Sequence, residues 1–260
     1  MAFFGFSTGA LSLGYFQEAL SLVHGTSMTA VELSALRLPE LPVLVDALPT
    51  LDLSQFSYVS VHAPSRFSAS EEDNVIDLLR KVPEKWPIIL HPDTIHDPEK
   101  WAGFGNQLAI ENLDRRKSDA RSAEELDRLF DRLPNARLCF DMAHAHQCDR
   151  TMTEAFRILL RFRGRICQLH ISELASAGHH FPLSYGSIQA FSEVASLIPA
   201  DSPAILESLN PLHGAGNDLQ KIWMEREISR ASKAIGRGEM LPDSPVSSGL
   251  AAFSSTPIPA

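Results

Sequence analysis

Strand-like runs and helical patterns alternate along most of this chain, and the alternation limits the folds that it can adopt. Residues 71–81, 121–132, 151–163 and 216–234 carry apolar residues at i, i+3 and i+4, which is typical of amphipathic helices. Eight short runs rich in β-branched, aromatic and other apolar residues are predicted as strands, at residues 3–7, 29–33, 57–62, 87–91, 107–111, 137–141, 166–170 and 204–207.

Strands that alternate with helices indicate an α/β protein with a parallel sheet. Eight strands within residues 1–235 predict a (β/α)8 TIM barrel in a single domain, because that fold typically takes about 250 residues. A doubly wound open sheet is the alternative, but it usually carries a glycine-rich phosphate loop, and the sequence has no G-x-G-x-x-G motif. Residues 236–260 are rich in Ser, Pro and Ala, so we expect an irregular tail there, disordered or draped over the barrel.

Composition and charge narrow the classes of partner. The formal net charge of −9 argues against a surface for nucleic acid, and "DRRK" at 114–117 is interpreted as ordinary loop charge. No apolar run is long enough to cross a membrane, and three cysteines are too few for a disulfide framework. The apolar N-terminal stretch lacks the basic region of a signal peptide. We therefore expect a cytoplasmic protein with a small-molecule substrate. The sequence is compatible with a monomer or a homo-oligomer.

Polar residues stand at the end of nearly every predicted strand. The carboxyl ends of barrel strands surround one mouth, where enzymes with this fold carry out their chemistry. A single histidine there is often a hydrogen-bonded structural residue, and a single carboxylate often caps the next helix. Six such residues at six strand ends instead predict a metal or catalytic site: His62, His91, Glu111, Asp141, His170 and Glu207.

A divalent cation would explain why these groups gather. Converging carboxylates repel one another, and mixed imidazole and carboxylate ligation suits Mn, Zn, Fe or Co ions. In "FDMAHAH" at 140–146, His144 follows Asp141 by three residues and is expected on the next turn, close enough to join the site.

Several of these stretches, taken in order, resemble the xylose isomerase-like TIM barrels. They are "VHAP" at 61–64, "LHPD" at 90–93, "IENLD" at 110–114, "FDMAHAH" at 140–146, "LHIS" at 169–172, "HFPLSYGSI" at 180–188 and "ILES" at 205–208. The resemblance covers residues 1–210. This superfamily contains sugar phosphate isomerases and epimerases as well as the endonuclease IV group.

The resemblance implies ligand sets for one to three metal ions. As in ketose epimerases, Glu111, Asp141, His170 and Glu207 would hold one ion, while the two glutamates move protons on either face of a sugar. As in the endonuclease IV group, His62 and His91 would hold a second ion, with Glu111 bridging the two. A third ion would use His144 and His180, but Gly178 stands where that group has an aspartate.

Three further residues are expected to contact substrate. They are Glu32, Arg66 and Asn112. For Glu32 a supporting or helix-capping role is the alternative, for Arg66 plain solvent exposure, and for Asn112 a hydrogen bond to a loop amide.

The sequence favours a divalent-metal-dependent isomerase or epimerase that acts on a small sugar, polyol or keto acid. Glu111 and Glu207 would transfer the protons, and the metal would stabilise the enediolate oxygens. The alternatives are a di- or trinuclear hydrolase such as a phosphoesterase, a multinuclear iron redox enzyme, and a barrel that binds metal without catalysis.

Overall fold

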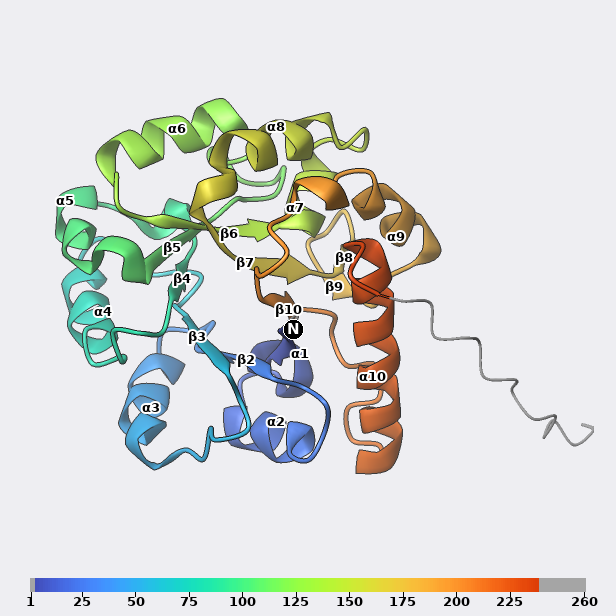
Figure 1. Ribbon diagram of the computed structural model, residues 1–260. Coiled ribbons are helices and arrows are strands. Elements are labelled where there is room, and N and C mark those ends of the chain that lie inside the picture. Colours follow the sequence, from blue (N-terminus) through green and yellow to red (C-terminus); the bar gives the residue numbers. More distant parts are fainter. Residues whose placement is uncertain (1–2, 239–260) are drawn as a thin grey trace, which may run out of the picture.

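Eight parallel strands pair edge to edge into a closed ring (Figure 1). The computed structural model describes residues 3–238, so nearly all of the tail expected at 236–260 lies outside the described residues. The ring closes where the first strand pairs with the last, Phe4 with Ala204. In ring order the strands are β1 Phe4–Ser7, β10 Ala204–Leu206, β7 Ile166–Ile171, β6 Arg137–Asp141, β5 Leu108–Glu111, β4 Ile88–Leu90, β3 Tyr58–His62 and β2 Ala30–Ser34.

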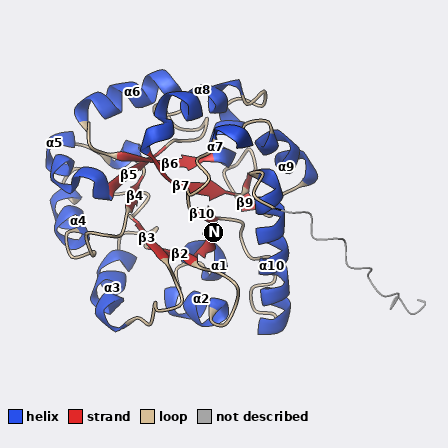
Figure 2. Ribbon diagram, in the orientation of Figure 1, coloured by secondary structure: helices blue, strands red, loops and turns tan. Residues whose placement is uncertain are grey.

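Helices surround the ring on its outside (Figure 2). The α-helices are α1 Thr8–Ser12, α2 Phe16–Val23, α3 Glu40–Ala47, α4 Glu72–Leu79, α5 Pro98–Trp101, α6 Ala123–Arg132, α7 Met142–Cys148, α8 Thr153–Phe162, α9 Tyr185–Ser192 and α10 Asn217–Ala234. Short 3-10 turns lie at Leu48–Thr50, Pro92–Thr94, Ala102–Gln107, Arg163–Arg165 and Ala195–Leu197. The prediction of a (β/α)8 TIM barrel is confirmed.

The helices form where the sequence supplies both a cap and an apolar stripe. In α8 the buried residues are Ala155, Ile158, Leu159 and Phe162, whose spacing of three and four places them on one face toward the strands. The side chain of Ser122 accepts a hydrogen bond from the backbone N–H of Glu125 and so caps the start of α6. Each buried face joins the apolar layer between helices and strands.

The predicted elements agree closely with the observed ones. The predicted helices 71–81, 121–132, 151–163 and 216–234 correspond to α4, α6, α8 and α10. Every predicted strand overlaps an observed one, although β4 and β10 end at Leu90 and Leu206, one residue before His91 and Glu207.

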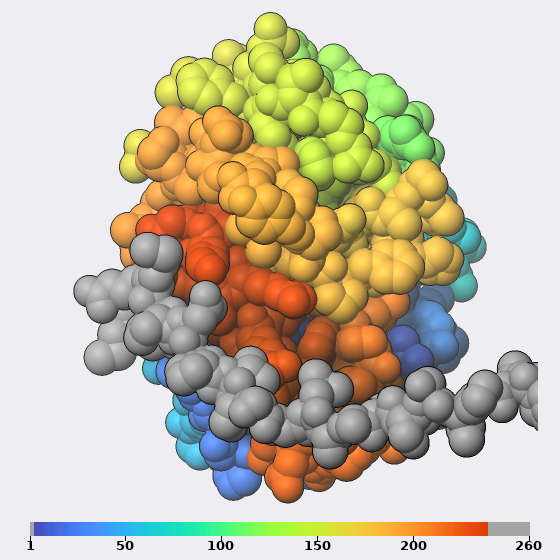
Figure 3. All heavy atoms as spheres, turned by 90° about the vertical axis from the view of Figure 1, so that its right-hand side faces the viewer, coloured from blue at the N-terminus to red at the C-terminus, as the bar shows by residue number. Residues whose placement is uncertain are grey.

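A small hairpin outside the ring was not predicted. Strands β8 Glu173–Leu174 and β9 His180–Phe181 pair antiparallel, and they carry His180 over the barrel mouth. Helices α9 and α10 pack against each other. They lie on the right-hand side of Figure 1, and Figure 3 shows this side facing the viewer. Among residues 3–238, no helix combines the length and the apolar character that crossing a membrane requires.

Candidate metal centre

Successive side chains along a strand point to opposite faces of the sheet, and this alternation places the predicted polar residues on the inside of the barrel mouth. Inward side chains lie two positions apart along a strand, so a buried apolar layer lies beneath the polar one. The lower layer includes Ile89, Ala109 and Cys139, which form a buried cluster with Cys167. Two residues further along these strands, at the mouth, lie His91, Glu111 and Asp141. The mouth layer is also buried, with Glu111 1% and Asp141 0% exposed.

Four of the six strand-end residues form one donor group, here called donor group 1: Glu111, Asp141, His170 and Glu207. One donor atom from each lies within 4.8 Å of the others. The Nδ1 atom of His170 is 3.3 Å from Oε1 of Glu111 and 3.5 Å from Oε1 of Glu207. Within the described residues, neither Nδ1 of His170 nor Oδ2 of Asp141 has a hydrogen-bond partner, although both atoms are buried. Unpartnered buried donors that converge in this way fit a divalent cation.

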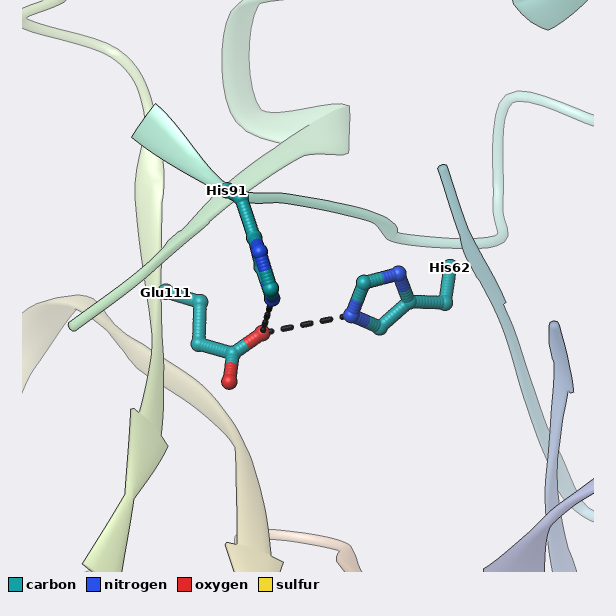
Figure 4. Close-up of side chains that lie close together, drawn as sticks. All are labelled: His62, His91 and Glu111. Atoms are coloured by element: carbon teal, nitrogen blue, oxygen red, sulfur yellow. Dashed lines mark hydrogen bonds and ion pairs between the residues drawn. The ribbon is translucent and has the colours of Figure 1, made fainter. Parts of the chain in front are cut away.

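His62, His91 and Glu111 form a second set, donor group 2, whose donor atoms also lie within 4.8 Å of one another. The Nε2 atoms of both histidines lie 3.3 Å from Oε2 of Glu111. Figure 4 shows both imidazole rings directed at this one oxygen. Nδ1 of His62 lies 2.7 Å from the carbonyl oxygen of Ala63, which can only accept a hydrogen bond. Nδ1 of His62 therefore carries a proton. Nε2 is the ring nitrogen that faces the carboxylate of Glu111, and a second proton or a cation can lie between these two atoms.

Glu111 connects the two groups because each of its oxygens faces a different one. Its Oε1 atom faces His170, and its Oε2 atom faces His62 and His91. A carboxylate in this position can bridge two ions, as the resemblance implied.

The third predicted ligand set does not form a converging group of three donors, although Nδ1 of His144 lies 3.2 Å from Oε1 of Glu111. Among the described residues, neither His144 nor His180 belongs to a converging donor group. Nδ1 of His144 lies 2.9 Å from the carbonyl oxygen of Asn112, and Nδ1 of His180 lies 2.8 Å from Oγ of Ser172. Both histidines do line the mouth, with ring centroids 5.9 Å apart. The position that would supply the carboxylate is Gly178, and the guanidinium of Arg116 fills the space where a side chain would begin.

Asp141 has two roles at once. Its Oδ1 atom accepts a hydrogen bond of 2.6 Å from the backbone N–H of His144 and so caps α7. The Oδ2 atom is left for donor group 1. The cap also explains why His144, expected on a simple turn, lies in the first turn of a helix.

Burial and neighbouring charges raise the pKa of some residues in this site and lower the pKa of others. Burial, with the charges of Glu111 and Asp141, raises the pKa of Glu207 to about 8. Burial also raises the pKa of Glu111, but the charges of His170 and His91 outweigh it and hold that pKa well below its usual range. For His62 burial lowers the pKa, while its hydrogen bond with Glu111 and the charge of Glu32 raise it to about 9. The two glutamates of donor group 1 therefore differ in protonation at neutral pH.

The three expected substrate contacts have different places in the structure. Arg66 lines the cavity at the mouth and is exposed. Glu32 lies in the middle of β2, is completely buried, and bonds to His170 and Gln168 instead of facing the cavity. Asn112 is also completely buried: its side chain donates to the carbonyl oxygen of Asp141 (2.9 Å) and accepts from the N–H of Asp141 (2.8 Å). Glu32 and Asn112 thus contact His170 and the backbone of Asp141, and neither lines the cavity.

The cavity at the mouth has a volume of about 470 Å³. Donor residues of both groups line it, and so do Asp114, Arg116 and Lys117, which the sequence alone presents as ordinary loop charge. The signal that these residues matter was their position directly after Glu111, because a loop that follows a barrel strand lies over the mouth.

Comparison with known proteins agrees with this fold. Residues 99–226 match the family model described as xylose isomerase-like TIM barrel. The chain folds as a xylose isomerase-like TIM barrel. The resemblance noted from the sequence motifs is thereby confirmed, whereas no curated protein matches the chain significantly.

Several solved structures superpose over most of this chain. A xylose isomerase domain protein from Alicyclobacillus acidocaldarius subsp. acidocaldarius is 15% identical, with a TM-score of 0.60 over 90% of this chain and 99% of that one. A xylose isomerase-like TIM barrel protein from Mycobacterium smegmatis, solved in complex with magnesium, is 10% identical (TM-score 0.52, 85% and 90% covered). The 3-keto-D-glucoside 4-epimerase of E. coli is 10% identical (TM-score 0.51, 87% and 100% covered). At these identities the likeness shows the fold.

Proposed function

We propose that this barrel is a divalent-metal-dependent isomerase or epimerase that acts on a small sugar, polyol or keto acid. The observation that carries the proposal is donor group 1, in which two glutamates and an aspartate converge with His170 in an open cavity. A volume of about 470 Å³ suits a small molecule, since such sites typically measure about 300–1,000 Å³. An epimerase among the structural neighbours is in keeping with this proposal.

Glu111, Asp141, His170 and Glu207 would hold the ion, for which Mn, Zn, Fe or Co suits the mixed ligation. When bound, the ion supplies Lewis acidity at substrate oxygens. Isomerisation and epimerisation also need one group that takes a proton from carbon and another that returns one. Glu111, with its lowered pKa, is ionised and can accept a proton. Glu207, whose pKa of about 8 without metal makes it the more basic of the two glutamates, can hold and return a proton.

A second candidate function, hydrolysis of a phosphoester, is favoured by donor group 2. A one-metal isomerase has no need for His62 and His91, which both face Oε2 of Glu111. Two adjacent ions are typical of phosphatases and nucleases, where they stabilise the attacking and leaving oxygens. In that case Glu111 would be occupied as a bridge and unavailable as a base.

Solvent-isotope exchange separates the two candidates. The protein is purified without added metal, its metal content is measured, and it is incubated with a panel of sugars and polyols in heavy water. An isomerase or epimerase places deuterium on carbon, which proton NMR detects, and we expect about one ion per chain. About two ions per chain, no exchange, and release of phosphate from phosphoesters would instead establish the hydrolase.

Variants at Glu207 show whether the exchange belongs to this site. We expect Glu207→Gln to abolish deuterium incorporation, because an amide cannot donate and retrieve the proton. Glu193→Gln changes an exposed glutamate outside the cavity and serves as the matched control. Exchange that survives in Glu207→Gln would refute the role assigned to this residue.

A further inference from the structure

Three basic side chains share the cavity with the donor groups. Arg66 comes from the loop after β3, and Arg116 and Lys117 come from the loop after β5. Neither a metal ion nor a proton transfer requires them, so their place in the wall calls for another explanation.

Arg116 is held in a fixed orientation. Its Nε atom lies 2.8 Å from Oδ1 of Asp114, its Nη2 atom 2.6 Å from Oδ2 of the same carboxylate, and its Nη1 atom donates to the carbonyl oxygen of Ala177 at 2.8 Å. The Asp114 side chain is only 2% exposed and that of Arg116 is 42% exposed, so the carboxylate is shielded from water while the guanidinium remains accessible at the cavity wall. A guanidinium has five N–H donors, and these three contacts leave two of them for a ligand.

Gly178 makes room for this arrangement. A Cβ atom at residue 178 would lie 1.6 Å from Nη1 of Arg116, closer than any real contact. The φ angle of Gly178 is +84°, which also disfavours a side chain. The hairpin loop thus contains a glycine at a point where a side chain would displace the arginine.

Arg66 carries the uncompensated charge of this wall. Asp114 pairs with Arg116, and Asp93 pairs with Lys117. Arg66 is exposed and has no ion pair or hydrogen bond among residues 3–238. A guanidinium presents its donors in a planar fork that matches a carboxylate or a phosphate.

We propose that the cavity takes a substrate with an anionic group, a phosphate or a carboxylate, which is bound by Arg66 and by the free N–H groups of Arg116. This inference rests on the proposed small-molecule function of the cavity and specifies the class of its substrate. In this arrangement the donor groups face the reacting end of the substrate, and the two arginines bind its anionic end.

Binding of simple anions tests the proposal. Inorganic phosphate and acetate are titrated calorimetrically into the metal-free and the metal-loaded full-length protein. We expect Arg66→Gln to weaken binding of the preferred anion about tenfold, which corresponds to about 1.4 kcal/mol, because the variant loses a hydrogen bond between charged groups. Tighter binding of phosphate or of acetate shows which of the two groups the site prefers. Arg80→Gln removes the same charge from the outer end of α4 and is expected to leave the affinity unchanged. Equal anion affinity in wild type and Arg66→Gln would overturn the proposal.

A pair of glycine variants tests the position of Arg116. Gly178→Ala is expected to lower anion affinity to a similar degree, since its methyl group must displace the guanidinium. Gly25→Ala is the matched control, because Gly25 also has a positive φ, +74°, but no atom within 4 Å of the added Cβ.

Metal content is measured for every variant. Lost anion affinity with wild-type metal content supports the subsite. Wild-type anion affinity in Gly178→Ala would refute the part assigned to Arg116. If the wild type binds no metal, the proposed function fails, while the titrations of metal-free protein still decide the anion subsite.

Discussion

Nε2 of His170 lies 2.9 Å from Oε2 of Glu32, a carboxylate completely buried inside the barrel. Gln168 donates to the same oxygen at 2.7 Å, and the hydroxyl of Tyr58 donates to Oε1 of Gln168 at 2.8 Å. The carboxylate accepts the proton of Nε2, so Nδ1 is the ring nitrogen that His170 directs at donor group 1. Burial lowers the pKa of His170, but neighbouring acidic groups raise it well above its usual value, so a cation must displace the Nδ1 proton before that atom can act as a ligand. This chain of contacts fixes the tautomer and the ring orientation that a ligand needs.

Removing the charge of Glu32 should therefore weaken metal binding. We expect Glu32→Gln to lower metal affinity by about 10–100-fold, the usual effect of losing a carboxylate behind a ligand histidine. Titration against a competing chelator measures the change. Tyr58→Phe, which removes only the outermost contact of the chain, should have a smaller effect. Wild-type affinity in a folded Glu32→Gln protein would contradict the positioning role.

Glu207→Gln should leave the metal-free protein as stable as the wild type. Because the pKa of Glu207 is raised to about 8, its carboxyl is mostly neutral at pH 7, and an amide of the same shape replaces it at little cost. Thermal unfolding should thus give a similar Tm without metal, and a smaller increase in Tm when metal is added. A large loss of stability in the metal-free variant would mean that the charged form is needed for folding.

Where the wild type binds two ions, His91→Ala should lower that number by about one, because donor group 2 then keeps only His62 and Glu111. The double variant His91→Ala/Glu111→Ala should lose both ions, since Glu111 faces both groups. Elemental analysis of the purified proteins measures the content. His24→Ala, at an exposed histidine remote from the cavity, is the control. Unchanged metal content in the double variant would count against the two-site arrangement.

Metal binding should release protons and strengthen as the pH rises. Without metal, Glu207 with a pKa of about 8 and His62 with a pKa of about 9 both hold a proton at pH 7. A cation must displace these protons, so its affinity should increase as the pH is raised through this range and fall below it. Calorimetry at pH 7 in buffers of different ionisation enthalpy counts the protons released. A heat that is independent of the buffer would contradict this assignment.

Asn112→Ala should destabilise the protein even without metal. Both polar atoms of the Asn112 side chain bond to the backbone of Asp141, and the side chain is completely buried. Leaving a buried backbone group without its partner costs about 1–3 kcal/mol, and urea unfolding measures this loss. The control is Asn74→Ala, an exposed position on α4. An unchanged free energy of unfolding would show that water replaces the amide.

The barrel and its ring of donors were predictable because both follow from periodicity. Polar residues such as Glu111 and Asp141 stand at the carboxyl ends of apolar strands, and in a parallel barrel these ends surround one mouth. Their convergence therefore follows from the fold alone. Even the bridging position of Glu111 follows from the matched motifs.

The roles of Glu32 and Asn112 were not predictable in this way. Alternation shows which side of a strand a residue occupies, but not what lies between it and the cavity. Glu32 is behind His170, and Asn112 turns toward the backbone of the next strand. The two-residue strands of the β8–β9 hairpin are too short to carry a pattern, so the contact between Gly178 and Arg116 appears only in three dimensions.

The order of the strands has a further consequence for how this protein would respond to metal. The donor residues extend from His62 to Glu207 at the ends of six strands that lie side by side in the ring, so they converge only once those strands have paired and curved around the mouth. Ions bound to these donors would stabilise the folded barrel over forms in which the strands are unpaired. Metal uptake would then report on folding itself, and cells short of the ion would accumulate chains that open and are degraded more readily.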